Sequence, residues 1–399
     1  MNPVKVFPTA LRPRSLDRYT QYFFMVVTLS CAAHSPPSNR AQDVRPAESE
    51  LSASLSAPEP PAPEPMAWNT TRSSGLGFRS RPRATSRVPM PGPVESLATD
   101  GSHIFVVAGG VAAMVASNVV AWKFPEAVAA LSYVPALSGG SLWLSREHEL
   151  LVVRPESGTV VQRIPSAASI KSAVKPDGDA VVWLTQDGVI HSTAGWTAQG
   201  LTSASGSVAV AGGNILDKPI VYAASLDGAL IAADSAGERW RARLPGPAVG
   251  APMVGPDGVF VAVAGINEPG GIIAVRTDGS PMWQTRTVHT PSLPPAMGPD
   301  GAGGWTVYLA DRTGKLYALE ENSGQERWNV EVGGAISAMS VMDDVVLVGA
   351  ADGVLYAVEA SDGGVRWRVE VGTITAAPLP VAGKIWIGLA EGALIALEE

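Results

Sequence analysis

A near-constant repeat of about 40 residues most constrains what this chain can fold into. Turn-like corners fall at Gly110, Glu149, Gly188, Gly228, Gly271, Gly314, Gly353 and Gly392, in steps of 39, 39, 40, 43, 43, 39 and 39 residues. Most corners are an acidic residue and a glycine before an apolar run. Because both residue types tolerate positive φ, such a pair suits a tight hairpin turn. Short strands at this step predict a radial β array, a β-propeller.

A single unit, residues 333–367, contains the pattern of a four-stranded blade. Apolar and β-branched runs occupy 335–342, 345–349 and 354–358, and a fourth run opens at 366–369. Such residues pack well on a pleated surface, and the polar pairs between the runs predict turns. The alternative is an antiparallel meander in a β-sandwich, which does not require eight equal repeats.

Tryptophan follows most corners at a regular offset. The offset is 12 residues for three of them, 14 for two and 8 for one, which gives Trp122, Trp240, Trp283, Trp328, Trp367 and Trp196. After Glu149 the slot at 12 residues holds Val161.

The last unit is incomplete, because the chain stops at Glu399, 7 residues past Gly392. An open strand edge invites aggregation, so another strand must pair with it. Residues 81–93 can supply that strand, since Ser86-Arg87-Val88-Pro89 and the following prolines resemble the sequence after Trp240. We therefore predict an all-β fold, a β-propeller of eight four-stranded blades whose ring is closed by an N-terminal strand. Seven blades are the alternative.

The repeat resembles that of the PQQ-like β-propellers. The pattern Gly-x-Leu-Tyr-Ala-Leu, a glycine-containing turn and then Trp stands at 314–328, again at 353–367, and in weaker copies at 228–240 and 392–397. The resemblance covers residues 80–399. It implies that the six tryptophans named above pack between neighbouring blades and hold the ring together.

The N-terminus has the features of an export signal. Four basic residues precede a short apolar run at 22–33, which is too short to span a bilayer. Cys31, the single cysteine, follows Leu29 and Ser30 in a pattern that resembles a bacterial lipobox, with Thr28 where that family usually has Leu. This predicts a signal peptide over 1–30 and lipidation of Cys31. The alternative is a fortuitous cysteine within an ordinary cleaved signal.

The next segment predicts a tether. Residues 34–77 are rich in Pro, Ser, Ala and Glu, and such a stretch cannot bury enough apolar area to fold. We assign 31–78 to a lipid-anchored disordered tether and 79–399 to the propeller. Because Ala32 rather than Asp follows the cysteine, the resemblance to lipoproteins points to the outer membrane, with the propeller facing the periplasm or the cell surface.

The sequence offers little chemistry. None of the five histidines has a ligand at metal spacing except His148, flanked by Glu147 and Glu149, and neighbouring strand residues point to opposite faces. Quinoprotein dehydrogenases of the resembled superfamily use a vicinal cysteine pair, and the predicted propeller contains no cysteine. A net charge of −8 gives no basic footprint for nucleic acid. We expect no catalytic residues, no metal, no cofactor and no nucleic-acid partner.

What remains is a binding surface. Insertions in a repeat array project on loops and often mark the working face. The longest insertions fall in two consecutive units, and the candidate partner-binding residues there are Asn267, Glu268, Pro291, Leu293, Pro294 and Trp305. The alternative is that these are only long surface loops.

A lipid-anchored PQQ-like propeller without cofactor ligands resembles the BamB family, accessory lipoproteins of the β-barrel assembly machinery. The resemblance implies a non-catalytic scaffold, monomeric and anchored through lipid alone, whose partners are barrel-assembly components or unfolded outer-membrane proteins. Two alternatives remain open: a cell-surface propeller that binds a ligand or protein, and a PQQ-dependent or other propeller oxidoreductase.

Overall fold

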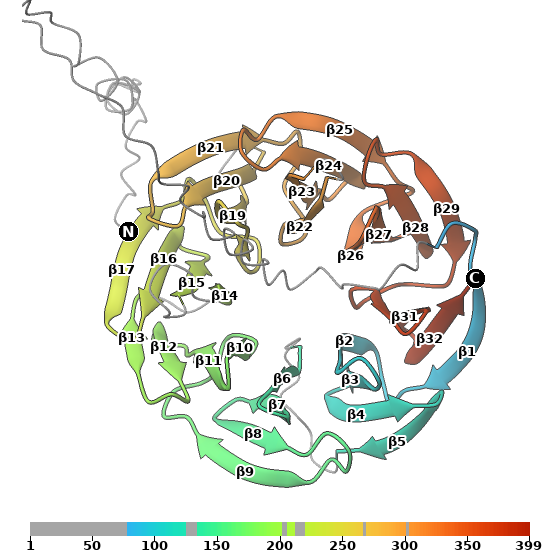
Figure 1. Cartoon of the computed structure of the whole chain (residues 1–399), viewed down its shortest axis with the longest axis horizontal. Helices are drawn as coiled ribbons and strands as arrows, with labels where there is room; N and C mark the ends of the chain where they lie inside the picture. The colour runs from blue at the N-terminus through green and yellow to red at the C-terminus, as the bar shows by residue number, and fades with distance from the viewer. Residues whose placement is uncertain (1–77, 125–133, 202–205, 212–219, 266–268, 301–302) are drawn as a thin grey trace, which may run out of the picture. The chain divides into compact units, whose positions relative to one another are not determined.

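Thirty-two strands in eight four-stranded antiparallel sheets make up the fold. The computed structural model describes residues 78–124, 134–201, 206–211, 220–265, 269–300 and 303–399. The sheets stand around a central axis like blades, as Figure 1 shows. The predicted eight-bladed β-propeller is therefore confirmed, and the seven-bladed alternative is excluded.

Blades 1 to 4 follow one another along the chain, each starting with its innermost strand. Blade 1 contains β2 (Val94–Thr99), β3 (Ile104–Ala108), β4 (Val111–Ala116) and β5 (Val119–Lys123). Blade 2 contains β6 (Ala136–Ser138), β7 (Ser141–Arg146), β8 (Glu149–Val153) and β9 (Val160–Pro165). Blade 3 contains β10 (Lys175–Asp177), β11 (Ala180–Leu184), β12 (Val189–Ser192) and β13 (Thr197–Gln199). Blade 4 contains β14 (Gly206–Ala211), β15 (Ile220–Ser225), β16 (Ala229–Asp234) and β17 (Gly237–Arg243).

Blades 5 to 7 repeat the plan, and blade 8 combines both ends of the chain. Blade 5 contains β18 (Met253–Val254), β19 (Gly258–Val263), β20 (Gly271–Arg276) and β21 (Pro281–Arg286). Blade 6 contains β22 (Ala296–Pro299), β23 (Trp305–Ala310), β24 (Lys315–Glu320) and β25 (Glu326–Glu331). Blade 7 contains β26 (Ile336–Met342), β27 (Val345–Ala350), β28 (Val354–Glu359) and β29 (Val365–Glu370). Blade 8 contains β30 (Leu379–Val381), β31 (Lys384–Leu389), β32 (Ala393–Glu398) and β1 (Arg83–Pro89).

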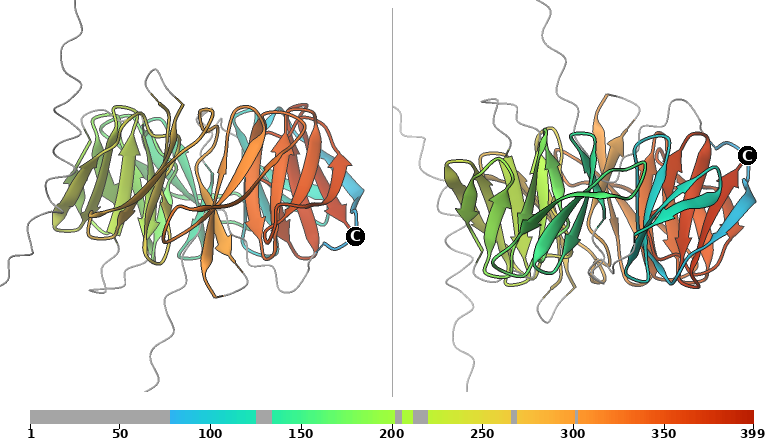
Figure 2. Two further views of the ribbon diagram at one scale, coloured as in Figure 1. Left: turned by 90° about the horizontal axis from the view of Figure 1, so that it is seen from above. Right: turned by 90° about the horizontal axis from the view of Figure 1, so that it is seen from below.

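The alternation of strand direction gives the ring two distinct faces. We call the crossover face the one where the chain passes from blade to blade and where second and third strands are joined. The opposite face carries the turns between first and second strands and between third and fourth strands. The two faces are the two sides of the disc seen edge-on in Figure 2.

The N-terminal strand closes the ring as predicted. β1 pairs antiparallel with β32, from Arg83 opposite Glu398 to Pro89 opposite Ala393. The Met90 N–H then donates to the Gly392 carbonyl at 2.9 Å. The last β-edge, which the C-terminus leaves open, is thereby covered.

The core consists of apolar layers between adjacent blades. One layer joins blades 6 and 7 through buried side chains such as Tyr308, Leu316, Val346 and Val358, all with no exposed area. Similar clusters occupy the other seams. Burial of apolar area is the main favourable term in folding, so the ring is held chiefly by these layers. No helix among the described residues could span a membrane.

Candidate partner-binding surfaces

Five tryptophans on outer strands dock onto the next blade. Each indole N–H donates to a main-chain carbonyl there, at 2.6 to 3.0 Å. The pairs are Trp122 with Pro155, Trp240 with Thr277, Trp283 with Glu321, Trp328 with Ala360, and Trp367 with Phe78. In the last pair the acceptor lies before β1, so Phe78, itself 3% exposed, is part of the seam between blades 7 and 8.

A glycine beneath the ring makes four of these docks possible. A Cβ on it would lie only 2.4 to 2.8 Å from the preceding blade's indole, and its φ is positive. These glycines are Gly158 under Trp122, Gly279 under Trp240, Gly324 under Trp283, and Gly363 under Trp328. Both the close approach and the left-handed backbone exclude other residue types.

Blade 2 departs from the pattern. Gln162 pairs with Val152 at the register where Trp240 pairs with Ala232 in blade 4. The offset in the sequence had indicated Val161, and that expectation is wrong because turn lengths differ. The turn after β8 closes where an N–H donates from residue 154 to the carbonyl of residue 159, whereas in blade 4 it spans only two residues.

Blades 3 and 8 depart in other ways. Ser86 of β1 pairs with Ala396 at the tryptophan register. The Trp196 side chain is half-buried against the cluster between blades 3 and 4, and no hydrogen bond from its indole is found in the described part of the chain. In blades 2 and 8 a tryptophan stands on the second strand at this register instead, Trp143 and Trp386.

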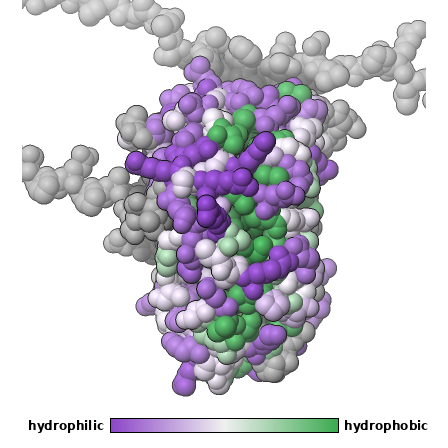
Figure 3. Space-filling view, turned by 90° about the vertical axis from the view of Figure 1, so that its right-hand side faces the viewer, coloured by the Kyte–Doolittle hydropathy of each residue, from purple (hydrophilic) through white to green (hydrophobic). Residues whose placement is uncertain are grey.

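The outer wall of the ring is mostly polar. Outer strands carry alternating charges, as in Arg366, Arg368 and Glu370 of β29, which protects their free edges from pairing with other chains. Figure 3 shows hydrophilic and hydrophobic residues interspersed on the wall near β29 and β1. Exposed valines occur singly on three outer strands, Val119, Val161 and Val365.

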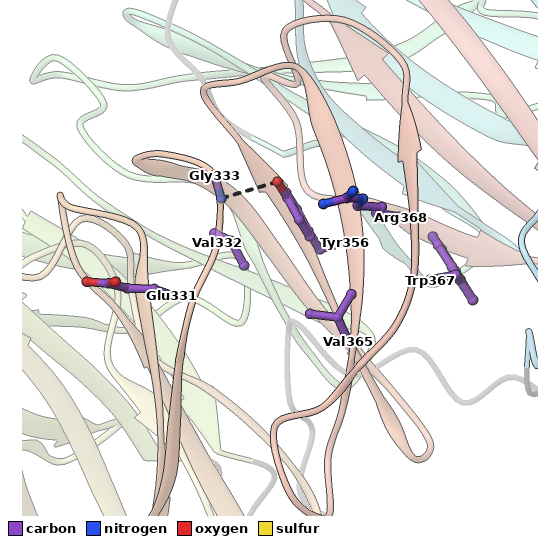
Figure 4. Close-up of a pocket in the computed structure, with 7 residues that line it drawn as sticks. All are labelled: Glu331, Val332, Gly333, Tyr356, Val365, Trp367 and Arg368. Carbon is purple, nitrogen blue, oxygen red and sulfur yellow. Dashed lines mark hydrogen bonds between the residues drawn. The ribbon is translucent and has the colours of Figure 1, made fainter.

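A groove of about 660 Å³ lies between blades 6 and 7 (Figure 4). Blade 6 contributes Glu331, Val332 and Gly333, and blade 7 contributes Tyr356, Val365, Trp367 and Arg368. The Trp367 side chain points away from the others, whereas Arg368 and Tyr356 are neighbours on adjacent strands. The groove therefore has an apolar part around the valines and a polar rim.

The Tyr356 hydroxyl fixes the geometry of this groove. It accepts the Gly333 N–H at 3.2 Å and donates to Asp352 Oδ2 at 2.5 Å. Burial raises the pKa of Tyr356, and the Asp352 carboxylate raises it further, so the hydroxyl remains a donor at neutral pH. Arg368 and Glu331 are exposed, and no ion pair holds either one within the described residues.

The predicted loop sector divides between the two faces. Pro291 bridges to Asp311 at the crossover face, and Leu293 packs partly buried against the cluster of blades 6 and 7. Pro294 lies against Gly250, where an added Cβ would be 2.3 Å from its ring. Trp305 pairs with Pro299 at the opposite face. Asn267 and Glu268 lie outside the described residues, as does Cys31.

Two buried carboxyl groups on blade 6 have contrasting environments. Burial alone would raise the pKa of Asp311, but donors from Thr313, Lys315 and Tyr317 outweigh it, and the pKa is lowered. Glu321, 2% exposed, accepts only a long N–H bond from Asp257 at 3.4 Å. Burial, with Asp257 as a smaller cause, raises the pKa of Glu321 to about 7.

Other buried titratable groups lie in blade 3. Burial lowers the pKa of Lys175 to about 8 and raises that of Asp177. His191 stacks on Trp183 with 5.3 Å between ring centroids, and burial lowers its pKa against the opposing effect of Asp187. Across the described ranges, no three His, Cys, Asp or Glu side chains are placed to hold a metal ion.

The fold and its repeated indole docks define a PQQ-like β-propeller. A family model described as "Outer membrane protein assembly factor BamB" matches residues 172–298 and 269–398, together more than half of the 399 residues. The chain belongs to this family. The matched region runs from blade 3 to blade 8.

Solved structures share the fold at low identity. The crystal structure of BamB from Moraxella catarrhalis aligns with a TM-score of 0.62 and 15% identity, over 80% of this chain and 98% of that one. The computationally designed Ika8 protein aligns at 0.65 and 14%, over 78% and 99%. Sqt1 of Saccharomyces cerevisiae aligns at 0.63 and 12%, over 79% and 98%. Among curated proteins no sequence matches.

Proposed function

We propose that this chain is a non-catalytic scaffold of the bacterial outer membrane that assists the assembly of β-barrel proteins. The observation that carries the proposal is the family match over blades 3 to 8, whose description names outer-membrane protein assembly. A closed, rigid ring with polar outer edges suits a protein that presents surfaces to others.

The proposed placement follows from the N-terminal sequence. A signal peptide over 1–30, a lipidated Cys31 and a tether over 31–78 would hold the propeller at the membrane through lipid alone. Replacing Cys31 with Ser should release the protein into the soluble fraction. A protein that stays in the membrane fraction after that change would contradict the proposed anchor.

The proposed partner surface lies on the crossover side of blades 6 and 7. Leu293 and Pro294 approach the connection between β25 and β26 from blade 6, where the neighbouring Ser292 hydroxyl donates to the Ile336 carbonyl at 3.2 Å. The groove with Arg368 borders the same connection. The exposed guanidinium, with apolar side chains beside it, suits an extended segment that carries an acidic residue next to an apolar one.

The test is a pull-down of the tagged full-length chain from detergent-solubilised membranes, with partners identified by mass spectrometry. Recovery of a β-barrel insertase is expected. Arg368→Glu should reduce it several-fold, whereas Arg243→Glu, a matched exposed arginine on blade 4, should not. A membrane-bound protein that recovers no insertase would contradict the scaffold proposal and favour a surface ligand-binding propeller.

A further inference from the structure

Two turns on the opposite face, one in blade 3 and one in blade 5, have the same geometry. In blade 5 the Arg276 N–H donates to the Ser280 carbonyl, and the Gly279 N–H donates back to Arg276. In blade 3 Ser192, Gly195 and Trp196 make the same two bonds at 3.0 Å each. The glycine φ is +87° in both turns, and a threonine follows the first residue in both, Thr277 and Thr193.

The blade 5 turn is occupied by a tryptophan from blade 4. The Trp240 ring lies 2.8 Å from a Cβ built on Gly279, and its indole N–H donates to the Thr277 carbonyl at 2.8 Å. The blade 3 turn has the same glycine and the same carbonyl, but no atom lies within 4 Å of a Cβ built on Gly195. The difference lies in the neighbouring blade, where Gln162 stands at the tryptophan register.

The surroundings of this turn suit an aromatic ring. Gln162 is exposed, and so is the adjacent Val161, at 56%. Behind Gln162, Trp143 on the second strand stands where Tyr222 packs beneath Trp240, with 5.8 Å between those two ring centroids. Within the described residues, no donor reaches the Thr193 carbonyl. We call Thr193, Gly195, Gln162 and Trp143 the indole socket.

We propose that the indole socket binds a tryptophan side chain that a partner protein presents on an extended segment. The same ring fills four equivalent glycine turns with its own indoles, which sets the chemistry of the occupant: a flat ring against the glycine and an N–H donor for the carbonyl. An indole combines a large apolar area with one donor, so it gains both burial and a hydrogen bond here. The proposal rests on the protein-binding function proposed above and adds a site for it.

The probe is N-acetyl-L-tryptophanamide, titrated into the isotope-labelled full chain and followed by NMR. The amide signals of Gly195 and the residues around it should shift, with a dissociation constant on the order of 1 mM for a single side chain. N-acetyl-L-alaninamide should leave them unchanged. The turn of Gly279 is the internal control, because its own indole already fills it.

The decisive variant is Gln162→Trp, which places an indole at the register used by the other blades. It should abolish the probe-induced shifts at Gly195 and raise the thermal midpoint, whereas Gln162→Ala should preserve the shifts. A second variant, Gly195→Ala, adds a Cβ where the ring would lie and should weaken probe binding at least several-fold.

The outcomes separate this proposal from the scaffold function. Undiminished probe shifts in Gln162→Trp, or no shift at Gly195 in the unmodified chain, would overturn the socket whether or not an insertase is recovered. Self-association that Trp68→Phe abolishes would identify a second copy as the occupant and overturn the partner proposal. Loss of a protein partner in Gln162→Trp, with the fold intact and the chain monomeric, would support it.

Discussion

The seam between blades 6 and 7 and the seam between blades 2 and 3 are built differently on the same framework. In the first, Trp328 is 9% exposed, lies on Gly363 and donates to the Ala360 carbonyl. In the second, Gln162 is exposed and Gly195 is uncovered. Second-strand aromatics, Trp143 and Trp183, fill that seam instead, at 8% and 6% exposed.

This difference teaches that the indole docks are not required at every seam. The apolar layer between blades is common to both seams, and the dock adds a hydrogen bond and a covered turn to one of them. Blade position alone does not explain the pattern, since blade 1 has a dock and blade 2 lacks one. A seam without a dock leaves a turn free for another molecule.

The largest expected effect comes from opening the one seam that joins the two ends of the chain. A chain that begins at Pro91 lacks β1 and Phe78, so β32 loses its partner and Trp367 loses its acceptor. We expect loss of cooperative unfolding and aggregation, measured by thermal circular dichroism and size-exclusion chromatography. A chain that begins at residue 71 is the control. Equal melting of both chains would mean that β1 does not close the ring.

Removing a dock should cost more than removing an undocked tryptophan. Trp328→Ala deletes a buried ring and leaves the Ala360 carbonyl without its donor, so a loss of about 3–5 kcal/mol is expected. Trp196→Ala should cost about 1–2 kcal/mol because the ring is half-buried. Chemical denaturation of both variants measures the difference. Equal losses would erase the distinction between the two kinds of seam.

Glycine substitutions test the same comparison from the other side of the dock. Gly363→Ala combines left-handed strain with a Cβ 2.7 Å from the Trp328 ring, so a loss of about 2–4 kcal/mol is expected. Gly178→Ala in blade 3 has comparable φ, +60°, but no atom within 4 Å, and should cost about 1 kcal/mol. If the two variants melt alike, backbone strain alone accounts for both glycines.

Much of this architecture could be predicted from sequence, because its signals are local. Acidic-glycine corners mark tight turns directly, and the missing outer strand followed from a count of residues after Gly392. The slot in blade 2 could not be placed, because the register depends on turn lengths that the spacing of corners does not reveal. The error of one residue exchanged Gln162 for Val161.

The candidate surfaces were harder to predict, because they join distant segments. Gly333 and Tyr356 meet across two blades, and only the corner Asp352 four residues before the tyrosine hinted at a fixed hydroxyl. Pro291 and Trp305 are close in sequence but lie on opposite faces, because one full strand separates them. Alternation of strand direction, had it been counted, would have separated them.

One dock differs from the others in carrying an acid. The four acceptor residues in third-to-fourth turns are Pro155, Thr277, Glu321 and Ala360, and only Glu321 is ionisable. Its carboxyl lies beneath the β18–β19 turn, where a Cβ on Gly255 would be 2.7 Å from Oε1. Asp257 on that turn repels it, and on blade 6 Asp300 and Arg327 pair with each other at 2.9 Å. The seam between blades 5 and 6 therefore favours a protonated acid.

The smallest predicted effect is a pH dependence specific to that seam. The pKa of Glu321 is about 7 in the fold and 4.5 in its absence, so the folded chain holds the proton more tightly between these values. Stability should fall by about 1–3 kcal/mol as pH rises from 4.5 to 7, at about 1.4 kcal/mol per pKa unit. His191, with a lowered pKa, acts in the opposite sense below pH 6.5, so the measurement is the difference between the wild-type chain and Glu321→Gln.

That difference, obtained from denaturation at pH 5, 6, 7 and 8, should shift in favour of Glu321→Gln with each step up to pH 7 and then level off. Glu320→Gln, at the neighbouring half-buried carboxylate, is the control and should show no such trend. Hydrogen exchange of the Trp283 indole relative to that of Trp328 locates the effect, because both indoles dock alike and only the first docks on an acid. A ratio that stays constant from pH 5 to 8 would mean that the Glu321 proton does not govern this seam.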